Sequence, residues 1–167
     1  MTISMYQASV PPFTRALNSL AAILEKAAAH AQSRKIDEAV LLGSRLYPDM
    51  FPLTRQVQIA TDTAKSGAGR LASADFPAFE DKESTIAELV ARIHNTIGYL
   101  QALQPAQIDG SENRTITWQT RSSTKNMQGL PYLMDHLLPN VHFHVTAAYC
   151  ILRHNGVELG KKDFLGP

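Results

Sequence analysis

Apolar residues recur every three or four positions in four separate segments of the chain, which is the period of one buried face of an α-helix. The first face reaches about Ala31 and comprises Val10, Phe13, Leu17, Leu20 and Leu24. Pro11 and Pro12 either occupy the first turn of this helix, where a missing amide hydrogen costs little, or kink a helical turn that starts at Ser4. The pattern is compatible with both starts.

The second helical segment covers residues 36–72 and is interrupted by Tyr47–Pro52, which contains two prolines. Because proline disrupts a helix interior, the sequence predicts a short helix, a bend and a longer helix that begins near Pro52. A third helix follows, because Thr85 and Glu88 have the spacing of a capping box and Pro105 ends the pattern. Its predicted apolar face comprises Ile86, Val90, Ile93, Ile97 and Leu100.

The last apolar segment, 129–156, has a histidine within its predicted buried face. That face comprises Leu130, Leu133 or Met134, Leu137, Val141, His144, Val145, Ala148, Ile151 and Leu152. His142 diverges from His144 by roughly 160 degrees on a helix, so it points outward. His136 and Asn140 precede His144 at four-residue spacing and would form a row with it. If Pro139 marks the start of the helix, only Asn140 remains beside His144.

Residues 106–128 are polar, and the alternation in Thr115–Thr120 followed by a serine-rich turn predicts a two-stranded hairpin. Taken together, the segments predict an all-α fold: an antiparallel four-helix bundle with a long crossover and a small β-hairpin before the last helix. A length of 167 residues fits one helical-bundle domain over 1–167.

The composition argues against nucleic acid and membranes as binding partners. Lys and Arg total 16 against 15 Asp and Glu, so the chain has no broad attraction for nucleic acid. We expect no membrane partner and no signal peptide, because the chain has no long uninterrupted apolar run and no basic flank at its start. The single cysteine, Cys150, favours a reducing compartment, and we expect a cytoplasmic protein.

The ending Asn140-Val-His-Phe-His144-Val-Thr-Ala-Ala-Tyr-Cys-Ile-Leu-Arg153-His-Asn-Gly156-Val resembles the last helix of the DinB/YfiT-like superfamily of four-helix proteins. The opening Met5-Tyr-Gln-Ala-Ser-Val-Pro-Pro-Phe, the middle Leu46-Tyr-Pro-Asp-Met-Phe-Pro-Leu and the tail Gly156-Val-Glu-Leu-Gly-Lys-Lys-Asp-Phe-Leu-Gly166 are similar to one branch of that superfamily, a domain of unknown function. The resemblance covers nearly the whole chain.

The resemblance implies a metal site made of one histidine from the second helix and an H-x-x-x-H pair on the last helix. His144 matches the second histidine of that pair, but Asn140 stands at the first. The second-helix position falls near Gln58, or at Gln56 or Asp62 in a shifted register. Amides bind zinc or nickel weakly compared with imidazole, so His144 predicts at most a weakly held divalent metal and the triad is degenerate.

Further donors depend on the fold. His94 of the third helix would add a second imidazole to the pocket if the fold brought it near, and Asp49 or Asp62 a carboxylate. The pocket candidates are therefore Gln56, Gln58, His94, Asn140 and His144.

Two functional hypotheses follow. The first is a small-molecule binding module or dimeric interaction protein that keeps the pocket without the metal. The alternative is a metal-dependent or thiol-dependent transferase or hydrolase that uses His144 as general base or sole metal anchor. Whether the protein is an enzyme stays open at this stage. The resemblance also implies a homodimer, for which the candidate contact aromatics are Tyr6, Phe76, Phe79 and Trp118.

Overall fold

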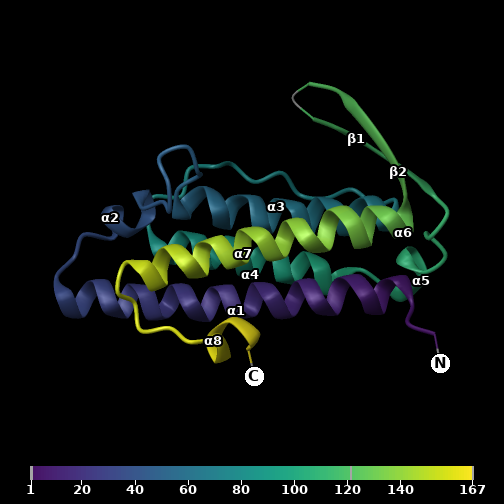
Figure 1. The fold of residues 1–167 in the computed structure, drawn as a ribbon. Coiled ribbons are helices and arrows are strands. Elements are labelled where there is room, and N and C mark those ends of the chain that lie inside the picture. The colour runs from purple at the N-terminus through teal and green to yellow at the C-terminus, as the bar shows by residue number, and fades with distance from the viewer. Residues whose placement is uncertain (1, 121, 167) are drawn as a thin grey trace.

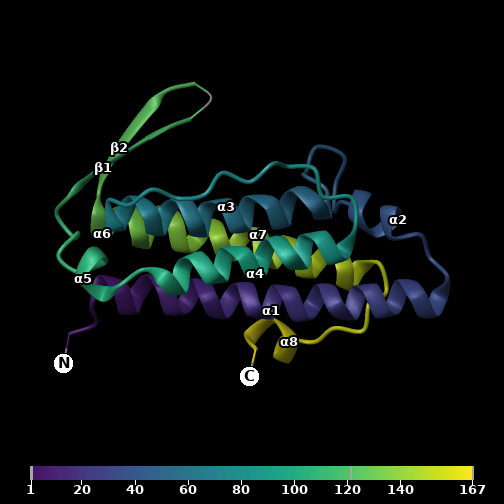
Figure 2. The ribbon, with the colours of Figure 1, turned by 180° about the vertical axis from the view of Figure 1, so that it is seen from behind.

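Four long helices form the body of the protein. The structure is a computed structural model that describes residues 2–120 and 122–166. The bundle consists of α1 (Met5–Arg34), α3 (Leu53–Ala72), α4 (Ile86–Ala102) and α7 (Leu138–His154), which lie side by side in Figures 1 and 2. α3 packs against α7 and α4, and α1 packs against the same two helices. The four-helix bundle predicted from the sequence is therefore confirmed.

The helix directions locate the crossover. The amide of Tyr6 at the start of α1 donates to Asp109 beyond the end of α4, so these two helices are antiparallel. α3 and α4 start at the same end of the bundle. Glu38 of the short helix that precedes α3, α2 (Glu38–Gly43), accepts a hydrogen bond from the amide of Ile86, and Thr54 at the start of α3 donates to the carbonyl of Leu42 in α2. These parallel neighbours are joined by residues 73–85, which run back along α3 in Figures 1 and 2. This connection is the predicted long crossover.

Two of the predicted helix starts are set by side-chain caps. Ser4 and Gln7 form a capping box at the start of α1, and the helix continues through Pro11 and Pro12. Of the two starts compatible with the sequence, the one at Ser4 is therefore observed. Thr85 and Glu88 form the predicted capping box of α4.

The second segment splits as predicted, into α2 (Glu38–Gly43) and α3, with the proline-containing bend between them. The chain also contains α5 (Pro105–Ile108), a single turn that the sequence pattern did not predict. Proline at its first position costs no backbone hydrogen bond. Ile108 is fully buried and attaches this turn to the bundle.

A two-stranded antiparallel hairpin precedes the last helix. It consists of β1 (Thr115–Gln119) and β2 (Thr124–Gln128), in a register that pairs Thr115 with Gln128. Ile116 is buried, and the ring of Trp118 lies 4.8 Å from that of Tyr132 between centroids. These two side chains attach the hairpin to the body.

The last helical segment is not a uniform α-helix. It comprises α6 (Gly129–Pro131), a π-helical turn η1 (Tyr132–Leu137) and α7. Pro139 has no amide hydrogen to bond the carbonyl of Asp135, which favours the wider turn. The extra residue rotates the preceding face, so Leu130 and Met134 are 46% and 48% exposed and Tyr132 is buried instead. The prediction that Leu130, or Met134 in place of Leu133, faces the core was therefore wrong.

The last described residues pack on α1. A short helix, α8 (Lys161–Leu165), packs against α1, where Asp163 accepts a hydrogen bond of 2.6 Å from Lys26. In the described part of the chain, no helix combines the length and apolarity needed to span a membrane.

Candidate functional site

His144 lies on the buried face of α7 and contacts the start of α3. Its side chain is 9% exposed, and its Nδ1 lies 2.7 Å from Oε1 of Gln56. The antiparallel packing of α3 against α7 brings these two residues together although they are 88 positions apart. Of the two glutamines considered from the sequence, Gln56 contacts His144 and Gln58 does not.

The tautomer of His144 follows from the orientation of the Gln56 amide. Nε2 of Gln56 donates to the backbone carbonyl of Phe51 at 3.0 Å, so the oxygen of the amide faces the imidazole. An amide oxygen only accepts, so Nδ1 of His144 is the protonated nitrogen and donates. The lone pair of the neutral ring is therefore on Nε2.

Nε2 of His144 makes no hydrogen bond to the described residues. In the described residues, the side-chain atoms that are both fully buried and without a hydrogen-bond partner are Thr14 Oγ1 and Ser111 Oγ. Nε2 of His144 also lacks a partner but is not one of these atoms, so part of its surface is reachable from solvent. Burial, and secondly the positive charge of Arg55, lower the pKa of His144 to about 4. At neutral pH the site therefore presents an uncharged acceptor nitrogen.

Gln58 belongs to a different set of contacts. It is buried, its Oε1 accepts from Arg55 at 3.1 Å, and its Nε2 donates to Glu83 at 2.8 Å. Arg55 also pairs with Asp81. Both ends of the Gln58 amide are thus used by charged side chains.

These contacts continue into a charge cluster between α3, α4 and the crossover, in which the central cation is buried and two carboxylates are partly exposed. The side chain of Arg92 is 2% exposed and pairs with Glu83 at 2.8 Å, Asp62 at 2.8 Å and Asp81 at 3.0 Å. Its Nε also donates to Thr61 at 2.9 Å. Burial alone would raise the pKa of Glu83, but hydrogen bonds from Arg92 and Gln58 outweigh it and hold that pKa below its usual value.

The apolar pattern did not predict this cluster, although the sequence contains one signal of it. Arg92 lies three residues after Leu89 and four before Thr96, both of which are buried, so a charged residue occupies the inner face of α4. A charged side chain at such a position is rare unless it is paired.

The other predicted pocket residues lie elsewhere. His94 is on the exposed face of α4 and has no hydrogen bond or ion pair with the described residues, so the structure does not join it to His144. Asn140 is half-buried, one helical turn before His144, and none of the described residues hydrogen-bonds to its side chain. His136 is in the π-helical turn, with its ring 5.5 Å from Tyr132 and 4.9 Å from Trp118 between centroids.

Residues 5–165 match the family model described as Domain of unknown function (DUF1993). The chain belongs to the DUF1993 family. Among solved structures, this DUF1993 chain is similar to a DinB family member protein from Shewanella denitrificans, with 44% sequence identity and a TM-score of 0.88. The similarity covers 97% of this chain and 92% of that chain. No curated protein matches the chain. The DinB-like bundle predicted from the sequence is thus confirmed.

Proposed function

We propose that this DUF1993 protein is a small-molecule binding module with a degenerate metal site, in which Nε2 of His144 accepts a hydrogen bond from an uncharged ligand. The observation that carries the proposal is the contact between Gln56 and His144. It fixes the tautomer that leaves the lone pair on Nε2, while burial and the charge of Arg55 keep the ring neutral.

A tightly held divalent metal does not fit these side chains. Gln56 Oε1 is used by His144, and Gln58 Oε1 is used by Arg55. Within residues 2–120 and 122–166, no three His, Cys, Asp or Glu residues form a group suited to a metal ion. The positive charge of Arg55, which lowers the pKa of His144, also opposes a dication at Nε2.

The polar groups around Nε2 suggest the class of ligand. Asn140 lies four residues before His144 and therefore on the same side of α7. Its amide both donates and accepts hydrogen bonds, whereas Nε2 only accepts. A primary amide ligand matches this pair, because its N–H can donate to Nε2 while its carbonyl accepts from Asn140.

Titration of the ¹⁵N-labelled protein with benzamide tests the proposal. We expect the Nε2 resonance of His144 to shift in a saturable manner, and Asn140→Leu to weaken binding about tenfold. Asn95→Leu, at an exposed position of α4, is the matched control and leaves binding unchanged. An Nε2 resonance that does not respond to benzamide at millimolar concentration contradicts the proposed ligand class.

Metal analysis of protein purified without a histidine tag tests the other half of the proposal. We expect less than one bound metal ion per chain after dialysis against a mild chelator. One zinc or nickel ion per chain that is lost in His144→Ala would instead support a metal-dependent transferase or hydrolase.

The enzymatic alternative has one observation in its favour, the solvent-reachable lone pair of His144. A general base works best with a pKa near the working pH. A pKa of about 4 makes protonation of His144 at neutral pH unfavourable by roughly 4 kcal/mol, so the geometry supports binding better than proton transfer.

A further inference from the structure

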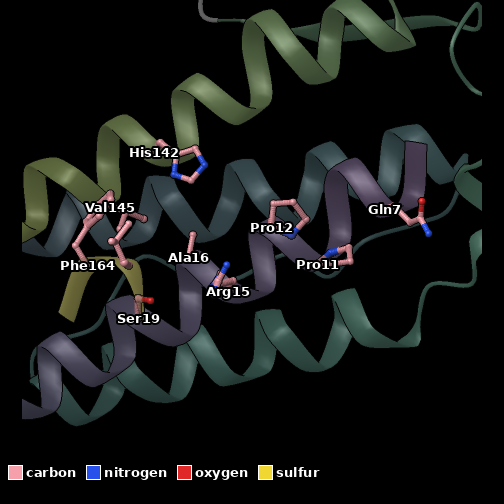
Figure 3. A pocket seen from close by; sticks show the side chains of 10 residues that line it. Gln7, Pro11, Pro12, Arg15, Ala16, Ser19, His142, Val145 and Phe164 are labelled. Atoms are coloured by element: carbon pink, nitrogen blue, oxygen red, sulfur yellow. The ribbon is translucent and has the colours of Figure 1, made fainter. Parts of the chain in front are cut away.

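The opposite side of α7 borders a cavity that is separate from the His144 site. The cavity has a volume of about 370 Å³ and lies between α1, α7 and α8 (Figure 3). Apolar surface comes from Pro12, Ala16, Val145 and Phe164. Pockets of roughly 300–1,000 Å³ with mostly apolar walls and a few polar groups are typical of small-molecule sites.

The polar groups of this cavity are positive or neutral. Arg15 of α1 and His142 of α7 both line it, and none of its described lining residues is acidic. A guanidinium has five N–H donors, so Arg15 can contact a ligand and keep another partner. Figure 3 shows His142 above Pro12 and Arg15, on the facing helix.

One wall of the cavity is the short helix α8. α8 contributes Phe164 and Leu165, yet none of its residues is fully buried. It is held through the pair of Lys26 with Asp163 and through the edge contact of Phe164 with Tyr149, whose ring centroids lie 6.0 Å apart. Displacing such a segment exposes little apolar surface, which provides a route into the cavity.

We propose that this cavity binds a small aromatic carboxylate, with the carboxylate beside Arg15 and His142 and the ring between Pro12, Val145 and Phe164. Guanidinium and carboxylate match in charge and in hydrogen-bonding geometry. The apolar walls receive the ring. This site is independent of the proposed function, because His144 points to α3 whereas His142 and Val145 border α1.

Binding of 1-naphthoate, compared with its uncharged methyl ester, tests the proposal by isothermal titration calorimetry. We expect saturable binding of 1-naphthoate at one site, and binding of the ester that is about tenfold weaker. Arg15→Gln should weaken naphthoate about tenfold and leave the ester nearly unchanged. Neither molecule has an N–H to donate to Nε2 of His144, so the ¹⁵N resonance of that atom should not respond to either.

Cavity-filling variants locate the site. Ala16→Phe places a ring in the cavity and should weaken naphthoate at least about tenfold, whereas Ala87→Phe, at an exposed position of α4, should have no effect. If circular dichroism shows that Ala16→Phe does not fold, His142→Ala serves instead, because its side chain is exposed and its removal leaves the core intact. In that variant too we expect weaker naphthoate binding.

Three results would overturn the proposal. The first is that 1-naphthoate fails to bind at millimolar concentration. The second is equal affinity for the acid and its methyl ester. The third is wild-type affinity in Ala16→Phe, or in His142→Ala where the first variant does not fold.

Discussion

The imidazole of His144 and the amide of Gln56 set each other's hydrogen-bonding roles. Gln56 is oriented by the carbonyl of Phe51, and that orientation decides which nitrogen of His144 carries the hydrogen. Burial disfavours the charged ring because water no longer solvates it. An inward-facing histidine was predictable from the helical period. Its tautomer, however, depends on Gln56 of another helix, and its neutral state depends on burial and on the charge of Arg55.

The lowered pKa of His144 has a consequence for stability. The unfolded chain takes up a proton near pH 6.5, whereas folded His144 stays neutral until about pH 4. The unfolded state therefore binds more protons between these values, and the free energy of unfolding falls as the pH is lowered. We expect His144 to account for a loss of roughly 3 kcal/mol from pH 6.5 to 4.

Urea denaturation of the wild type and of His144→Asn across this pH range measures the effect. The variant should show a correspondingly smaller loss of stability on acidification. His142→Asn is the control, because that side chain is exposed. Parallel pH profiles for the wild type and His144→Asn would mean that the ring is not held neutral.

Among the helices, α3 and α4 are parallel neighbours joined by a crossover of which most residues are exposed. The charge cluster around Arg92 connects all three elements, since it pairs with Asp62 of α3 and with Asp81 and Glu83 of the crossover. Lys65 adds a cation–π contact with Phe79 of the crossover, 3.7 Å from the ring centroid. The crossover is thus attached to the bundle by charged side chains more than by apolar ones.

Removing the central cation should destabilise the bundle strongly. Arg92→Ala leaves buried oxygen atoms without their donors, and we expect a loss of about 3 to 5 kcal/mol in the free energy of unfolding, measured with urea. Lys82→Ala breaks an ion pair with Glu80 whose two side chains are largely exposed, and should cost less than about 0.5 kcal/mol. Similar losses in the free energy of unfolding for the two variants would show that the contacts of Arg92 stabilise the bundle no more than an exposed ion pair does.

Alanine substitutions at two glycines should change stability in opposite directions, one through helix propensity and the other through close packing. A Cβ added at Gly98 in α4 meets nothing within 4 Å, so Gly98→Ala should stabilise the protein by about 0.5 to 1 kcal/mol. At Gly129, where α6 begins, the same atom would lie 2.0 Å from the backbone oxygen of Ser111. We expect Gly129→Ala to destabilise by about 1 to 3 kcal/mol.

Thermal unfolding followed by circular dichroism compares the two glycine variants directly. The melting temperature should rise for Gly98→Ala and fall for Gly129→Ala. A rise in both would indicate that the chain near Ser111 can move away without loss of packing.

At the scale of the whole molecule, the hairpin is an attachment to the bundle rather than one of its layers (Figure 1). It is attached by buried Ile116 near its base and by Trp118 farther along β1, which packs against Tyr132 and His136. Trp118 is the sole tryptophan of the chain, so its fluorescence reports on this attachment. Of the aromatics predicted as dimer contacts, Phe76 is exposed while Tyr6, Phe79 and Trp118 are half-buried, and the homodimer stays a prediction.

The attachment of Trp118 leads us to expect cooperative unfolding. Trp118 packs on Tyr132 of the π-helical turn, and α7 follows that turn directly. Loss of the turn would therefore release both the hairpin and α7, so tryptophan fluorescence and far-ultraviolet circular dichroism should give coincident urea transitions. A fluorescence transition at lower urea concentration than the dichroism transition would contradict this and show that the hairpin detaches first.

The sequence by itself determined the four long helices, two of their boundaries and the DinB-like bundle. Apolar spacing, the capping box at Thr85 and the prolines act through the local backbone, so their effects are visible in a short window of residues. The same holds for the alternating hairpin strands, since each depends only on neighbouring positions.

The tertiary structure alone decided which residues meet. It paired His144 with Gln56 rather than Gln58, left His94 on the surface, buried Arg92 among carboxylates and placed His142 beside a cavity against α1. The π-helical turn likewise left Leu130 and Met134 exposed and buried Tyr132. Such contacts join positions far apart in the chain, so they depend on how whole helices rotate and slide against each other, which no local pattern encodes.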